Sequence, residues 1–114
     1  MGHDAQLLKG TLRLVVLRLL AREPMYGYQM IQHLRDRSEG YFDVGEGALY
    51  PLLHEMESGG FLQGKWVDSE ERPQRRRYYH LTEKGKRELA RRRAAWRGFA
   101  RAMDLVLEAT HARV

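Results

Sequence analysis

The chain has 114 residues, a formal net charge of +5 and no cysteine. Its length fits a single domain with a small hydrophobic core, which a partner subunit would help to stabilise. The lack of cysteine in the sequence excludes disulfide frameworks, thiolate metal sites and cysteine nucleophiles, and it fits a reducing compartment such as the cytoplasm.

A first helix is predicted over about residues 4–21, where apolar residues recur at helical spacing. It is apolar on nearly every side, so we expect it to be buried, partly against something outside its own domain. Its apolar run, 14–21, contains Arg18 and is shorter than the roughly 20 residues that cross a bilayer. Because the N-terminus does not resemble a signal peptide either, we expect a soluble cytoplasmic protein with no membrane partner.

A second helix is predicted over about residues 27–37. Pro24 separates it from the first helix, because proline biases the preceding residue away from helical conformation. Met30, Ile31 and Leu34 stand at helical spacing and form the inward stripe.

The segment EGALYPLLHEMESGG, residues 46–60, predicts a third helix with two different faces. Its leucines and methionine fall within about 100° of arc, which makes one face a core face. The opposite face is formed by Gly47, Pro51, His54 and Ser58, and the glycine pair ends the helix. Whether the helix begins at Gly47 or nearer Tyr50 stays open, since a proline costs least in a first turn.

Two β-rich runs, FLQGKWV at 61–67 and RRYYHL at 76–81, flank a polar segment and predict a hairpin with a long basic tip. Cations in or beside a hairpin are suited to contact phosphates or to enter a minor groove. The predicted contacts are Lys65, Arg72, Arg75, Arg76 and Arg77.

The charge of the chain is uneven. Residues 1–64 contain 6 Lys/Arg against 8 Asp/Glu, whereas residues 65–114 contain 14 against 7. A one-sided positive field favours a polyanion as the partner.

The last helix is predicted from Thr82, which can serve as the N-cap, to about residue 110. Its first half is rich in arginine, and its second half carries an apolar stripe at helical spacing. The three-helix core has no room left for this stripe, so we expect it to pack on its own copy in a homodimer. We then expect the chain to divide into residues 1–82, a unit that binds the polyanion, and residues 83–114, a dimerisation helix.

The order of three helices and a hairpin is typical of a winged helix-turn-helix, in which the third helix enters the major groove. The predicted fold class is therefore mainly α with a small β-hairpin wing and a long C-terminal dimerisation helix. Small residues on the third helix, namely Gly47, Ala48 and Pro51, permit close approach to DNA. Tyr50 and His54 offer a hydroxyl and an imidazole to phosphates or base edges.

The chain resembles the PadR family of transcriptional regulators. The resemblance is carried by LLKGTLRLVVLRLL at 7–20, YGYQM at 26–30, EGALYPLLHEMESGGFL at 46–62 and RPQRRRYYHLTEKGKREL at 72–89. It implies a dimeric repressor that binds double-stranded DNA, and it places Tyr28 and Tyr50 at or near the DNA; a dimer would suit a palindromic operator. It also implies that the first and last helices form the dimer interface, for which we predict Leu8, Leu12, Val15, Phe99, Met103, Val106 and Leu107.

Some members of that family bind flat aromatic effectors on a tryptophan of the last helix, and Trp96 stands at that place by motif counting. An aromatic residue at helical spacing more often packs an interface, so both interpretations of Trp96 stay open.

Two other classes of function compete with DNA binding. The histidines are scattered and HEME at 54–57 lacks the zinc spacing HExxH, so we expect no enzyme, catalytic residue, metal or cofactor. The alternative is a module that docks an acidic protein or a membrane through the basic last helix. That alternative leaves the outer face of the third helix and the basic hairpin unexplained.

Overall fold

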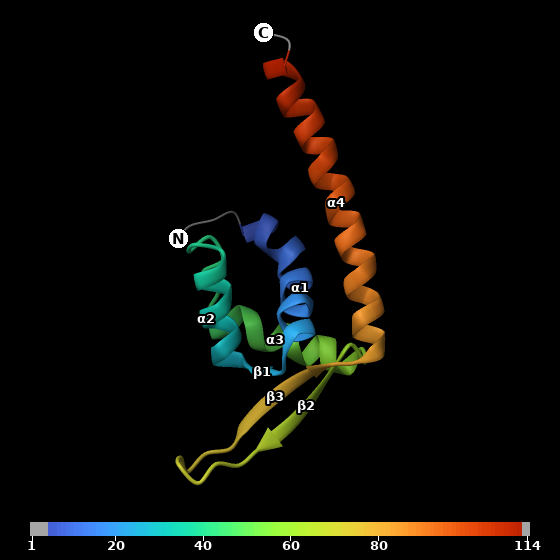
Figure 1. The fold of residues 1–114 in the computed structure, drawn as a ribbon. Coiled ribbons are helices and arrows are strands. Elements are labelled where there is room, and N and C mark those ends of the chain that lie inside the picture. The colour runs from blue at the N-terminus through green and yellow to red at the C-terminus, as the bar shows by residue number, and fades with distance from the viewer. Residues whose placement is uncertain (1–4, 113–114) are drawn as a thin grey trace.

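The structure is a computed structural model that describes the backbone of residues 5–112 and the side chains of residues 11–108. Three helices form the body, and the wing and the last helix extend from it in opposite directions (Figure 1). In chain order the elements are α1 (Ala5–Arg22), β1 (Met25–Tyr26), α2 (Gly27–Arg37), α3 (Glu46–Ser58), β2 (Leu62–Val67), β3 (Arg76–Leu81) and α4 (Glu83–Ala112). All four predicted helices are confirmed, each within about two residues of its predicted ends.

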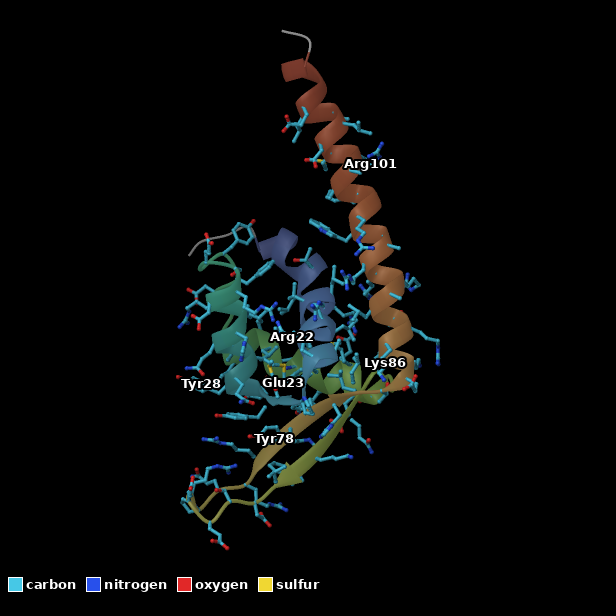
Figure 2. All side chains as sticks on the ribbon, in the orientation of Figure 1. Arg22, Glu23, Tyr28, Tyr78, Lys86 and Arg101 are labelled. Carbon is cyan, nitrogen blue, oxygen red and sulfur yellow. The ribbon has the colours of Figure 1, made fainter. Side chains whose placement is uncertain are left out.

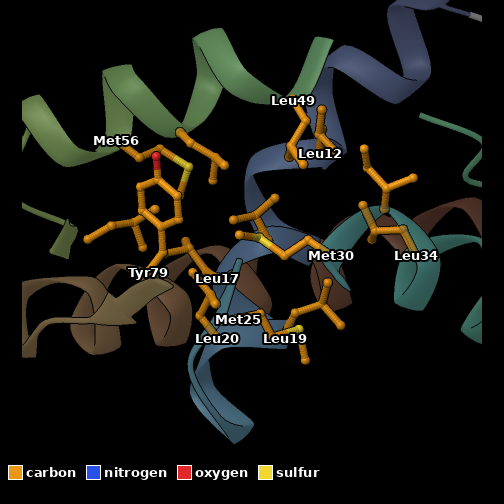
Figure 3. Close-up of a cluster of buried hydrophobic side chains, with 14 of the residues drawn as sticks. Leu12, Leu17, Leu19, Leu20, Met25, Met30, Leu34, Leu49, Met56 and Tyr79 are labelled. Atoms are coloured by element: carbon orange, nitrogen blue, oxygen red, sulfur yellow. The ribbon is translucent and has the colours of Figure 1, made fainter. Parts of the chain in front are cut away.

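One hydrophobic core joins α1, α2 and α3 to the sheet (Figure 3). The apolar stripes predicted for α2 and α3 face this core. Leu12, which we predicted at the dimer interface, is only 6% exposed and belongs to the core of its own chain. The largest fully buried side chains are Val16, Leu17, Met25, Met30, Leu49, Leu53 and Met56.

The sheet is antiparallel and has the strand order β1-β3-β2. The hairpin of β2 and β3 is confirmed, with Leu62 opposite Leu81 and Val67 opposite Arg76. The two-residue strand β1 adds a third strand, with Met25 opposite Tyr79. The sequence does not predict β1, because two residues show no alternation and their pairing with β3 is long-range.

The start of α4 is tied to the end of α3. Thr82 is the N-cap, as predicted: its Oγ1 accepts a hydrogen bond from the Gly85 backbone N–H at 3.0 Å. The same hydroxyl is 2.7 Å from the carbonyl oxygen of Gly60, to which it donates. Lys84 Nζ donates to the carbonyl oxygen of Gly59 at 2.7 Å, which caps the last turn of α3. The direction of α4 is therefore coupled to α3.

Beyond its first turns, α4 leaves the body and exposes both charged and apolar side chains (Figures 1 and 2). Its arginine run is partly neutralised within the helix, because Arg91 and Arg92 both bond Glu88, at 2.7 and 2.5 Å. These hydrogen bonds, above all that from Arg91, lower the pKa of Glu88 to about 2. No helix in the described part of the chain has the length and hydropathy of a membrane span.

Candidate nucleic-acid interface

Helix α3 begins at Glu46, with Gly45 as an N-cap that offers no side-chain hydrogen bond. Pro51 therefore lies in the second turn, and the alternative of a helix that begins nearer Tyr50 is wrong. Because Pro51 has no N–H, the carbonyl of Gly47 lacks its usual donor four residues later. The opposite face is exposed as predicted, at Gly47, Pro51, His54 and Ser58, and Ala48 beside it is exposed too.

Tyr50 lies on the flank of α3 rather than on its outer face, and it is half-buried. Its ring packs on Gly27, where an added Cβ would be 2.6 Å from Tyr50 Cζ, so this close approach requires a glycine at the start of α2. Burial, and then the nearby charge of Glu46, raise the pKa of the Tyr50 hydroxyl. The group therefore stays neutral at physiological pH and can both donate and accept hydrogen bonds.

Tyr28 follows Gly27 and is exposed at the start of α2. In Figure 2 it lies at the end of the molecule from which the wing projects, as does Tyr78 of β3. Tyr28 is thus placed on the same side as the wing.

Two acidic residues near the end of α3 are neutralised by arginines from other elements. Glu55 Oε2 is 3.1 Å from Arg13 Nη2 of α1. Glu57 Oε2 is 2.6 Å from Arg77 Nη2 of the wing and also accepts the backbone N–H of Gly64 at 3.0 Å. A polyanion beside the last turns of α3 therefore meets these two carboxylates already paired.

The predicted basic residues of the wing have different environments. Arg75 is exposed, and its Nε is 4.0 Å from Asp68 Oδ1. Arg76 is half-buried, with its Cζ 4.2 Å from the ring centre of Tyr26. Arg72 donates a hydrogen bond to the carbonyl of Gln74. Lys65 is opposite Tyr78 in the hairpin, so the Lys65 side chain lies on the sheet face opposite to that of Arg77.

A cavity of about 610 Å³ lies between the start of α2, the flank of α3 and the wing. It brings together five of the predicted site residues, Tyr50, His54, Arg75, Arg76 and Arg77, and leaves Lys65 and Arg72 outside its lining. Sequence reasoning missed Trp66, which also lines it, although strand alternation places Trp66 on the same sheet face as Arg77. Aromatic rings beside guanidinium groups favour a nucleic-acid strand as the ligand. Within the described residues, no cluster of His, Asp or Glu is suited to hold a metal ion.

Comparison with known proteins places this geometry in a family. The family model "Transcriptional regulator PadR-like family" matches residues 16–91. A PadR-like transcriptional regulator of Bacillus cereus is 31% identical, with a TM-score of 0.80 over 91% of this chain and 98% of that one. A PadR family transcriptional regulator of Eggerthella lenta is 34% identical, with a TM-score of 0.78 over 90% of this chain and 87% of that one.

A shorter match joins 39% of this chain to 21% of the transcriptional regulator YqjI of Escherichia coli, at 36% identity over 44 residues. The family model covers well over half of the chain, and it includes α2, α3, the whole wing and the first turns of α4. The fold, with its three-stranded sheet and long last helix, agrees with that of the solved relatives. The chain therefore belongs to the PadR-like family of transcriptional regulators, which are not enzymes.

Proposed function

We propose that the protein is a cytoplasmic, dimeric repressor that binds a palindromic operator in double-stranded DNA. The observation that carries this proposal is the cleft in which the flank of α3 meets the arginines of the wing. The N-terminal half of α3 enters the major groove, where Gly47, Ala48 and Pro51 allow close approach. The positive end of the helix dipole then faces the DNA.

The side chains around α3 divide into three groups by their proposed roles. His54 is exposed and free to meet a base edge or a phosphate, Tyr50 lines the same cavity, and Tyr28 is exposed at the start of α2. Arg75 and Arg76 bind backbone phosphates on the wing side. Arg77 is held by Glu57 and acts mainly by fixing the wing relative to α3.

Arg76→Ala is expected to weaken binding to specific and random duplexes alike and to reduce the slope of log K against log salt by about 1. The reason is that Arg76 lies over Tyr26 with no carboxylate partner within the described residues, so its guanidinium can bind one phosphate. Fluorescence anisotropy with labelled duplexes over a range of salt concentrations measures both effects. Arg101→Ala, on α4 beyond the body (Figure 2), is the matched control and should leave the slope unchanged. An unchanged slope in Arg76→Ala would remove this residue from the interface.

We also propose that residues 83–114 form the dimerisation element and residues 1–82 the DNA-binding element. In support, the predicted interface side chains of α4, Phe99, Met103, Val106 and Leu107, are all exposed in the single chain. Val15 of α1 is half-buried beside a small surface groove, and Leu8 lies outside the residues whose side chains are described. A helix that exposes an apolar stripe of this length needs a second helix to cover it.

We propose further that Trp96 binds a small planar aromatic effector at this interface. The rings of Trp96 and Phe99 are tilted by 39°, with their centres 5.6 Å apart. Trp96 also borders an open surface groove of about 550 Å³ along α4, which extends away from the Phe99 stripe to Leu105. In a Trp66→Phe background, where Trp96 is the one remaining tryptophan, planar aromatic cations and anions are expected to quench its emission saturably and to release DNA. Emission that does not respond to any of these compounds would leave Trp96 with a packing role alone.

Family membership and the intrahelical pairing of Arg91 and Arg92 with Glu88 both weigh against a module that docks acidic partners through α4. Charges already paired within a helix contribute less to the attraction of a second polyanion.

A further inference from the structure

The inner face of the wing continues the hydrophobic core outward toward the tip. Residues that oppose each other in an antiparallel ladder share one face of the sheet, and every second residue returns to that face. Leu62 and Tyr79 of this face are buried in the core. Trp66 and Arg77 oppose each other farther along the same face, where the wing leaves the body. Trp66 therefore faces the side on which α3 lies.

Trp66 is 54% exposed, more than any other large hydrophobic residue of the two wing strands. It is flanked by two cations. Arg75 Cζ is 4.8 Å from the centre of its ring and Arg77 Cζ is 5.4 Å away.

The position of Trp66 is fixed by contacts that begin on α3. Glu57 holds Arg77 by an ion pair of 2.6 Å, and Arg77 in turn lies against the indole. Gly64 makes this possible, since a Cβ at that position would be 2.6 Å from Arg77 Cζ. The Arg77 guanidinium thus lies against β2 at Gly64, and it holds the Trp66 ring at a set position relative to α3.

An exposed indole between guanidinium groups, on the wall of a cleft opposite His54, matches the chemistry of a nucleic-acid strand. The sugar and base offer apolar surface to the ring, and the phosphate between them offers charge to the arginines. An acidic protein segment would satisfy the arginines but would give the indole no flat apolar partner.

We propose that Trp66 is a direct DNA contact: its indole packs on the deoxyribose of the strand that runs through the cleft, while Arg75 binds the adjacent phosphate. This inference rests on the proposed function, because it requires DNA in the cleft. It adds an apolar contact to a wing that would otherwise bind by charge alone. A contact of this kind depends little on salt, unlike those of the arginines.

The test uses a Trp96→Phe protein, in which Trp66 is the one remaining tryptophan, and a random-sequence duplex of about 24 base pairs, long enough for two half-sites. At saturation we expect the emission of Trp66 to change and its quenching by acrylamide to fall several-fold. Trp66→Ala should weaken binding to this duplex on the order of tenfold, with an unchanged salt slope. Trp66→Phe should recover most of the affinity, and it guards against a misfolded wing.

Three results would overturn the inference. One is a saturated complex in which Trp66 stays as open to acrylamide as in the free protein. Another is wild-type affinity in Trp66→Ala, and the third is a salt slope lowered by about 1 in that variant, which would mean that Trp66 only positions Arg75. In each case the wild-type protein still binds DNA. Failure of the wild-type protein to bind any duplex at low salt would instead reject the proposed function together with the inference.

Discussion

Gly85→Ala is expected to lower the free energy of unfolding by about 3 kcal/mol, the upper end of the usual cost of overpacking. A Cβ at this position would meet the carbonyl oxygen of Phe61 and would lie 2.6 Å from Leu81 Cδ1. The carbonyl cannot move away freely, because it accepts hydrogen bonds from the N–H and the hydroxyl of Thr82 at 3.2 and 3.0 Å. The substitution therefore loosens the N-cap of α4 together with the wing. Urea denaturation followed by circular dichroism measures the loss.

Gly98→Ala is the matched control for this prediction, because it makes the same change in the same helix. A Cβ at Gly98 meets no atom within 4 Å, and the position lies away from the apolar stripe of α4. Alanine should therefore keep or raise the stability, by up to about 1 kcal/mol, through its higher helix propensity. If both variants lost the same stability, the close approach at Phe61 would not be the cause.

The elements of this fold that rest on local patterns could be predicted from the sequence. Helical periodicity locates the helices, and Pro24 and Gly59 mark where two of them end. The outer face of α3 follows from the same periodicity, and the Thr82 cap follows from a threonine before an acidic first turn. In each case the residues that decide the outcome are within about four positions of one another.

The features that could not be predicted depend on residues far apart in the chain. Periodicity places Tyr50 on the flank of α3, but it does not show that the ring packs on Gly27, 23 positions earlier in the chain. Arg77 cannot be told from its arginine neighbours by sequence, and its ion pair with Glu57 joins residues 20 positions apart. Such pairings are decided by how the wing packs on α3, for which a single sequence holds no periodic signal.

The register of the hairpin is an intermediate case. Strand alternation alone puts Lys65 and Trp66 on opposite faces of the sheet, but it does not say which of the two faces α3. The burial of Leu62 and Tyr79 settles the choice. Every second residue along each strand shares their face, so Trp66 and Arg77 lie on the inner face with them. A prediction that treats all wing cations as equal phosphate contacts therefore misses this distinction. It also misses the aromatic residue between them.

Phe99→Asp is expected to convert the protein into a folded monomer and to reduce operator affinity by at least about a hundredfold. Phe99 is 53% exposed and stands in the apolar stripe of α4 beside Trp96. A carboxylate there would be buried without a partner at a helix-helix interface, which opposes association strongly. Once the dimer is lost, the two half-sites no longer act as one ligand, and avidity of about 10²–10⁴ disappears with it. Sedimentation velocity measures the mass, and anisotropy on an operator selected from a random library measures the affinity.

Leu105→Asp is the control that makes this result specific to one face of α4. Leu105 is 56% exposed, on the same helix and with similar apolar surface, but it lies about 120° around the helix from Phe99. If the Phe99 stripe forms the interface, Leu105→Asp should remain a dimer with operator affinity close to that of the wild type. A Phe99→Asp protein that sediments as a dimer would contradict the proposed interface, whatever its affinity for DNA. If Leu105→Asp alone became monomeric, the dimer would form through the other face of α4, and Trp96 would then be free of the partner helix.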